Sequence, residues 1–235
     1  MPTRHRVDIA AADPVTALAY PAAPRTRAGI CVLLAHGAGG NQASPFMVEF
    51  AGALAARGID AVTFNFVYSE QKRRLPDRND KLEACWRAMI AAFREGAFGE
   101  SVGRGKLAIG GKSMGGRIAS QVAAADPAGL AGLVLLGYPL HPPGRPEQLR
   151  TRHLPDIRVP LLIVQGERDA FGTPEELRPV LRTLKAPAEL YVIEAGDHSF
   201  KVPKSAGTPQ AQVHARVLDE IDRWLRATIG AKPRR

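Results

Sequence analysis

Short runs of apolar residues alternate with stretches of helical periodicity over most of the 235-residue chain. Continuous apolar runs are typical of strands covered on both faces of a sheet. Apolar residues at three- to four-residue spacing instead indicate amphipathic helices. We therefore expect strands at 6–11, 15–20, 28–35, 59–67, 107–109, 130–140, 159–164 and 188–194. We expect helices at 45–57, from about 80 to 93, from 114 to 126, from 174 onward and from about 208 to 229.

The alternation of strands and helices predicts an α/β fold. Strands joined through helices make right-handed crossovers, which give a mostly parallel, twisted sheet with helices on both faces. The two opening strands are expected to be antiparallel and at the sheet edge. The length predicts one domain over residues 1–235, with its core at about 15–228. The terminal segment 231–235 is expected to be frayed.

One apolar run ends in a turn that carries a serine between two glycines. Gly111, Ser113 and Gly115 have the spacing of a nucleophile elbow. Such a serine stands at the tip of a strained strand-to-helix turn, and side chains at the two glycine positions would collide with the strand and helix. The N–H of Met114 would then point to the place where a substrate oxyanion forms, at the positive end of the helix.

The same residues admit two other interpretations. Gly111, Lys112 and Ser113 also match the end of a phosphate-binding loop. That motif needs a glycine where Lys106 stands, and residues 107–109 are strand-like rather than loop-like, so a nucleotide-binding protein is disfavoured. A tight turn without chemistry stays open on this motif alone.

Candidate active-site residues also follow three other apolar runs. His36 and Ala38 lie in a glycine-rich turn after 28–35, Asp169 follows 159–164, and His198 follows the last strand. The carboxyl ends of parallel strands gather active-site groups at one edge of a sheet. The chain order serine, aspartate, histidine is the order expected for an α/β-hydrolase triad.

On these motifs the chain resembles a small α/β-hydrolase of the dienelactone-hydrolase-like kind, over residues 15–228. The segments 137–144 and 165–172 are similar to a narrower α/β-hydrolase-like family with testis-expressed and chromatin-complex-associated members. The resemblance implies the α/β-hydrolase fold. It also implies an oxyanion hole made by the N–H groups of Ala38 and Met114.

The candidate residues predict a serine hydrolase. A serine hydroxyl becomes a nucleophile only when a base takes its proton, and His198 would be that base and later the acid. Asp169 would hold the imidazole tautomer and stabilise its charged form. The alternatives are a loop histidine at 198 and a turn or cap residue at 169. Asp197 is interpreted as a turn former.

We expect the enzyme to cleave an ester or related acyl bond of a small substrate through an acyl-enzyme, as a carboxylesterase or a dienelactone-hydrolase-like enzyme does. The alternative is a non-catalytic protein of the same fold that serves as an interaction scaffold. Loss of a triad residue would favour the scaffold, and no triad residue is lost.

The other histidines and nearby cations are given structural roles. His36 is expected to support the glycine turn, and His141 and His153 to be pocket wall or surface residues. Solvated charge, rather than an anion site, is expected at Lys112, Arg168 and Lys201.

Composition narrows the partners. A protein with a net charge of +9 could bind nucleic acid, but the arginines are spread along the chain without a nucleic-acid recognition motif. We expect no nucleic acid, membrane, metal or cofactor partner. Residues 1–8 lack the apolar stretch of a signal peptide. Cys31 and Cys85 are expected to be buried free thiols, which predicts a cytoplasmic protein.

The connection at 141–158 predicts an open site. It holds four prolines in 18 residues, which leaves no room for a lid of helices. We expect a shallow site walled by 141–158, 41–45 and 66–70. A shallow site leaves long acyl chains in water, so short acyl groups are expected to be preferred.

Overall fold

Eight strands form one sheet in the computed structural model, which describes residues 1–10, 12–99, 102 and 105–230. Their spatial order is β1-β2-β4-β3-β5-β6-β7-β8. In chain order the strands are β1 (Thr3–Ile9), β2 (Ala12–Tyr20), β3 (Ile30–Ala35), β4 (Asp60–Phe64), β5 (Lys106–Lys112), β6 (Leu130–Leu136), β7 (Leu161–Gly166) and β8 (Ala188–Ile193).

The sheet is parallel except at one edge. β3 to β8 run in one direction, whereas β2 is antiparallel to both β1 and β4. The predicted α/β architecture and the antiparallel opening pair are confirmed. β3 and β5 lie at the centre, where every residue of β3 is buried.

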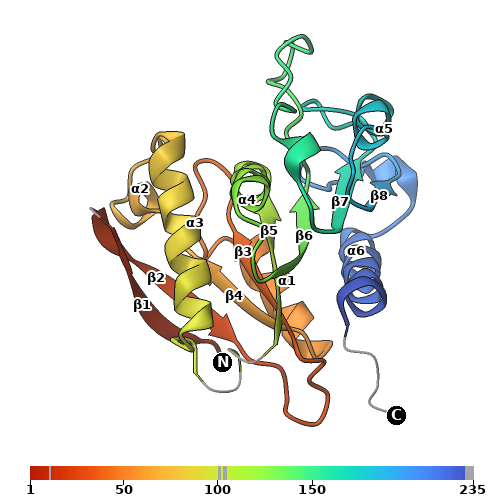
Figure 1. Ribbon diagram of the computed structural model, residues 1–235. Helices are drawn as coiled ribbons and strands as arrows, with labels where there is room; N and C mark the ends of the chain where they lie inside the picture. The colour runs from red at the N-terminus through yellow and green to blue at the C-terminus, as the bar shows by residue number, and fades with distance from the viewer. Residues whose placement is uncertain (11, 100–101, 103–104, 231–235) are drawn as a thin grey trace.

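Helices cover both faces of the sheet (Figure 1). The longer helices are α1 (Pro45–Ala56), α3 (Asn79–Arg94), α4 (Met114–Ala125), α5 (Pro174–Leu181) and α6 (Gln210–Trp224). Side chains of α3, α4 and α5 belong to one hydrophobic cluster, and those of α1 and α6 to a second cluster on the other face. Both predicted thiols, Cys31 and Cys85, are free and buried.

Two strands end earlier than their apolar runs suggest. β4 stops at Phe64, and a short helix, α2 (Val67–Glu70), follows it. Val67 and Tyr68 are buried in that helical turn, so the apolar run continues beyond the end of the strand. β6 stops at Leu136 because Gly137 has a φ of +66°, a left-handed conformation that turns the chain out of the sheet.

The connection between β6 and β7 contains one short 3₁₀ turn, Leu154–Asp156, and no other helix. It projects beyond the rest of the molecule at the top of Figure 1, where it is green to teal. The prediction that this segment builds no lid domain is confirmed. The frayed end predicted at 231–235 lies outside the described residues. No helix in the described part of the chain is long and apolar enough to cross a bilayer.

Candidate active site

Ser113 occupies a strained turn between β5 and α4. Its φ is +50°, a left-handed value that is rare for a residue with a side chain. Its N–H donates to the carbonyl of Leu136 at 2.9 Å, which fixes the turn to β6. A Cβ at Gly111 would lie 2.2 Å from the carbonyl oxygen of Ala35, and one at Gly115 would lie 2.5 Å from the same oxygen. The need for both glycines is thus confirmed, but the obstacle is the backbone at the end of β3.

Three of the sequence-predicted residues form a continuous hydrogen-bonded chain. Nε2 of His198 lies 2.9 Å from Oγ of Ser113. Nδ1 of the same ring lies 2.9 and 2.8 Å from the two carboxylate oxygens of Asp169. With Nδ1–H donating to the carboxylate, Nε2 is left to accept the serine proton.

Asp169 is held by two donors that the sequence interpretation did not include. Its side chain is fully buried, and the N–H of Phe171 donates to Oδ1 at 2.8 Å. Gln165 donates from Nε2 to Oδ2 at 2.8 Å and accepts from the N–H of Tyr138. A glutamine at the end of an otherwise apolar strand was the available signal, because a buried amide must find partners.

The loop that carries His198 is fixed from both sides. Oδ1 of Asp197 accepts from the N–H groups of Ser199 and Lys201 at 2.7 and 2.9 Å, as expected of a turn former. On the other side, Nζ of Lys112 donates to the carbonyl of His198 and lies 5.0 Å from the ring centre of Phe200.

Lys112 is therefore not the solvated charge that was predicted. Burial lowers the pKa of its ammonium group to about 8, against the opposing influence of Asp169 and Asp197. The sequence could not reveal this, because the long side chain turns back under a loop 86 residues away.

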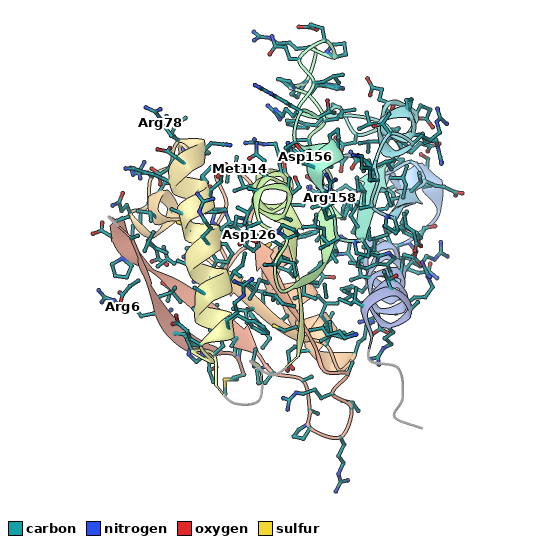
Figure 2. All side chains as sticks on the ribbon, in the orientation of Figure 1. Arg6, Arg78, Met114, Asp126, Asp156 and Arg158 are labelled. Carbon is teal, nitrogen blue, oxygen red and sulfur yellow. The ribbon has the colours of Figure 1, made fainter. Side chains whose placement is uncertain are left out.

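The predicted oxyanion donors flank the serine. Gly37 and Ala38 line the same cavity as Ser113 and Met114. A Cβ at Gly37 would lie 3.6 Å from Cβ of Ser113, so the glycine turn passes directly beside Ser113. Neither the N–H of Ala38 nor that of Met114 donates to another described residue. In Figure 2 Met114 lies at the start of α4, on the upper side of the sheet.

His36 supports this turn, as predicted. Its Nδ1–H donates to the carbonyl of Gly37 at 2.8 Å, and its Nε2 accepts from the N–H of Phe66 at 3.3 Å. These two bonds require the neutral ring. Burial lowers the pKa of His36 to about 4, so the ring stays neutral near pH 7.

Comparison with known proteins now identifies the family. A family model described as an alpha/beta hydrolase domain matches residues 28–226, which is most of the chain. The chain belongs to the α/β hydrolase family. A hydrolase is thus supported at the level of the family.

Solved structures share the fold of this hydrolase at low sequence identity. A dienelactone hydrolase from Anabaena variabilis is 20% identical, with a TM-score of 0.75, over 97% of this chain and 99% of the other. An α/β serine hydrolase without a lid from Xanthomonas campestris is 19% identical, with a TM-score of 0.74, over 99% and 97%. An α/β serine hydrolase homologue from Coxiella burnetii is 18% identical, with a TM-score of 0.70, over 95% of each chain.

Two cavities of about 500 Å³ flank the serine of the hydrolase and share the turn at 37–38 and Lys112. One contains Ser113 and His198 and is also lined by Pro76, Arg117 and Arg150. The other is more apolar and is lined by Pro45, Phe46 and Met47 of α1.

The predicted walls are partly wrong. Residues 41–45 and 141–158 do contribute through Ser44, Pro45 and Arg150, but 66–70 lines neither cavity. The short helix α2 turns that segment under β2, where Glu70 accepts from the N–H of Thr16. Residues from Pro76 to Leu82 provide the wall instead.

The remaining candidates lie outside the cavity of Ser113, although Lys201 lines the second cavity beside α1. Arg168 is exposed and donates to the carbonyl of Ala195, and Lys201 is exposed. His141 is buried against Glu176, at 3.3 Å. His153 hydrogen bonds to Ser120 at 2.8 Å.

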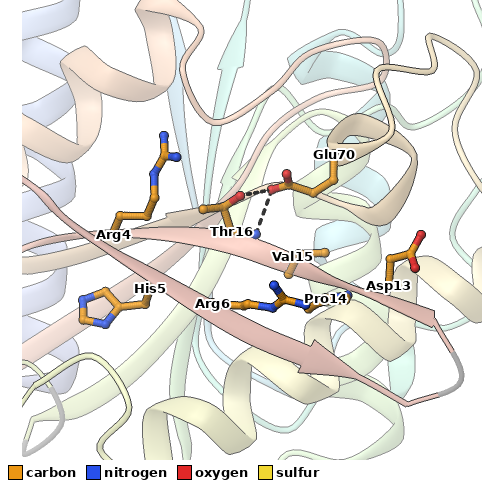
Figure 3. Close-up of a pocket in the computed structure, with 8 residues that line it drawn as sticks. All are labelled: Arg4, His5, Arg6, Asp13, Pro14, Val15, Thr16 and Glu70. Carbon is orange, nitrogen blue, oxygen red and sulfur yellow. Dashed lines mark hydrogen bonds between the residues drawn. The ribbon is translucent and has the colours of Figure 1, made fainter.

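A larger hollow of about 640 Å³ lies along the β1–β2 edge (Figure 3). It is lined by Arg4, Arg6, Asp13 and Glu70, and by none of the predicted triad or oxyanion-hole residues. Its most enclosed carboxylate, Glu70, already accepts from Thr16, and the residues that line this hollow include no serine–histidine pair like that at Ser113.

Proposed function

We propose that this hydrolase is a serine hydrolase that cleaves an ester or related acyl bond of a small substrate. Ser113 would be the nucleophile, His198 the general base and acid, and Asp169 the group that orients the imidazole. The observation that carries the proposal is the unbroken chain of hydrogen bonds through these residues, on a turn whose strain exposes the serine hydroxyl.

In the proposed mechanism Oγ of Ser113 attacks the acyl carbon while Nε2 of His198 takes its proton. The N–H groups of Ala38 and Met114 stabilise the oxyanion of the tetrahedral intermediate. His198 returns the proton to the leaving oxygen, and the bond to the leaving group breaks. Water then attacks the acyl-serine through the same sequence of proton transfers, which releases the acid and restores the hydroxyl.

Small acyl groups are the proposed substrates, because the connection between β6 and β7 contains no lid helices. An acyl chain that stays in water forgoes about 0.8 kcal/mol for each CH₂ group. We further propose that residues 1–235 form one domain and that the chain acts without nucleic acid, membrane or cofactor. Membership of the narrower family suggested by 137–144 and 165–172, and a cytoplasmic location, stay predictions.

A series of p-nitrophenyl esters from acetate to palmitate tests this proposal. We expect kcat/KM to be highest for short chains, and Ser113→Ala to abolish turnover of every ester without lowering the melting temperature. Turnover retained in the variant would refute the role of Ser113. A kcat/KM that keeps rising to palmitate would refute the open acyl site. Absence of turnover on every ester would favour the scaffold.

A further inference from the structure

Two arginines line the cavity of Ser113, and the proposed reaction does not use either. Arg117 lies on α4, one helical turn after the serine, and its backbone N–H donates to the carbonyl of Ser113 at 3.0 Å. Residues four apart lie on the same face of a helix. Arg117 lines the cavity that also holds Ser113.

Arg150 reaches the same cavity from the connection between β6 and β7. Its backbone is fixed there, because the backbone N–H donates to the carbonyl of Leu140 at 2.8 Å and the backbone carbonyl accepts from the hydroxyl of Tyr138 at 2.7 Å. Tyr138 is almost completely buried. Arg150 is thus placed over the site by a core residue, although it belongs to a surface connection.

Neither guanidinium is neutralised by the described residues. Arg117 makes only long contacts, of 3.4 Å, with the amide oxygens of Gln121 and Asn79. Arg150 contacts the carbonyl of Pro139 at 3.4 Å. No described carboxylate forms an ion pair with either arginine.

The other charged groups at this cavity are already paired. Asp77 accepts from Arg73 at 2.7 Å and from the N–H of Tyr68 at 3.0 Å. Lys112 donates to the carbonyl of His198. The two arginines are therefore the groups that remain for a ligand.

Burial lowers the pKa of Arg117, and the neighbouring charge of Arg150 lowers it further. Holding two like charges together in a partly desolvated site is unfavourable unless an anion offsets them. A guanidinium group can donate two parallel N–H bonds to a pair of oxygens of a carboxylate or a phosphate.

We propose that Arg117 and Arg150 form an anion subsite, so that the preferred substrate is an acyl ester that also carries a carboxylate or phosphate group. This inference rests on the proposed function, because the anion is positioned relative to Ser113. A hydrogen bond to a charged group contributes about 1.5–3 kcal/mol, which corresponds to a preference of about ten- to a hundredfold.

The kinetic test uses mono-p-nitrophenyl adipate and its methyl ester, whose distal ends are a carboxylate and an uncharged methyl ester, and follows the release of p-nitrophenol. We expect a kcat/KM at least tenfold higher for the acid, after subtraction of the rate with Ser113→Ala. Arg117→Gln combined with Arg150→Gln is expected to remove that preference, so that the ratio of kcat/KM for the acid to that for the methyl ester falls to about one. Arg152→Gln, in the same connection but exposed and outside the cavity, is the matched control and is expected to keep the preference.

A binding test does not depend on turnover. Adipate and phenyl phosphate are added to Ser113→Ala, with or without the two arginine substitutions, and dimethyl adipate is the neutral control. A rise in melting temperature that needs both arginines supports the subsite, and the more effective anion identifies carboxylate or phosphate as its ligand.

Equal kcat/KM for the two adipate esters would overturn the subsite while turnover by Ser113 upholds the proposed function. If neither ester is hydrolysed, the proposed function fails and the melting temperatures alone decide the subsite. No shift with either anion, or equal shifts with and without the arginines, would then overturn it.

Discussion

Two serine–histidine pairs occur among the described residues of this hydrolase, and in one of them a carboxylate accepts from the far side of the imidazole ring. Ser113 pairs with His198 at 2.9 Å, and Ser120 pairs with His153 at 2.8 Å. The two distances are nearly the same, and the two serines lie seven residues apart around the start of α4. Proximity of a hydroxyl and an imidazole therefore does not distinguish the pairs.

The direction of the hydrogen bonds distinguishes them. Ser120 donates its only proton to the carbonyl of Arg117 at 2.7 Å, so Nε2 of His153 must carry a hydrogen and donate to the serine. At the other pair, Asp169 accepts from Nδ1 of His198, which leaves Nε2 free to accept from Ser113. The comparison teaches that the carboxylate behind the ring sets the direction of the hydrogen bond between serine and imidazole.

The largest expected effect separates the two serines. Ser113→Ala is expected to lower kcat/KM by about 10⁴- to 10⁶-fold on a short p-nitrophenyl ester, because nucleophile and base act as one unit. Ser120→Ala changes a buried helical side chain outside the cavity and is expected to alter kcat/KM by no more than about twofold. A loss with Ser120→Ala as large as that with Ser113→Ala would reverse the assignment.

The next effect tests the carboxylate. Asp169→Asn is expected to lower kcat by about 10⁴-fold, because the amide favours the wrong imidazole tautomer. Asp197→Asn keeps an oxygen that can accept from Ser199 and Lys201, so a far smaller loss is expected. Steady-state kinetics on both variants decides the matter, and the opposite ranking would move the role to Asp197.

A smaller effect concerns Lys112, which donates to the carbonyl of His198. Lys112→Met removes this charge-assisted bond, worth about 1.5–3 kcal/mol, and is expected to lower kcat roughly ten- to a hundredfold through misplacement of the ring. KM is expected to change little. Lys112→Arg, which keeps the donor, should recover part of the loss; a Met variant with unchanged kcat would contradict the positioning role.

The same substitution has a pH signature in stability. Burial lowers the pKa of Lys112 from 10.5 to about 8, so between these values the unfolded chain binds more protons than the folded one. Wild-type stability should therefore rise relative to Lys112→Met as the pH increases from about 8 towards 10.5. Urea unfolding of both proteins at pH 7.5 and 10 measures this difference, and a constant difference would count against it.

The smallest effect is expected at the second pair. Burial and the charge of Arg117 lower the pKa of His153 to about 4, from 6.5. Between pH 6.5 and 4 the unfolded chain therefore binds more protons at His153 than the folded protein does. As a result the free energy of unfolding decreases as the pH falls through that range. Substitution of His153 by Asn is expected to reduce this acid-induced loss by about 1–2 kcal/mol, once solvent screening is allowed for. Urea unfolding at pH 7 and 4.5 is the measurement.

The sequence predicted the fold well because its signals are local. Apolar runs and helical spacing located the strands and helices, and chain order placed Ser113, Asp169 and His198 at neighbouring strand ends. Errors occurred where tertiary contacts override local pattern. Residues 67–68 are buried in a helical turn, and their apolar character alone could not distinguish this turn from a continued strand.

Supporting residues were harder to find than the three that form the hydrogen-bonded chain. Gln165, Lys112 and Arg150 act through contacts with residues distant in sequence or through a shared cavity. A lone amide or cation has no motif, so its role depends on packing that only the structure describes. The arginine spread along a basic chain also concealed the two that meet at the cavity.

Covalent labelling tests the central claim most directly. Wild type, Ser113→Ala and Ser120→Ala are treated with a fluorophosphonate, and the modified peptide is located by mass spectrometry. We predict one adduct on Ser113 in wild type and in Ser120→Ala, and none in Ser113→Ala. An adduct on any other residue, or undiminished labelling of Ser113→Ala, would contradict the assignment of Ser113 as the nucleophile.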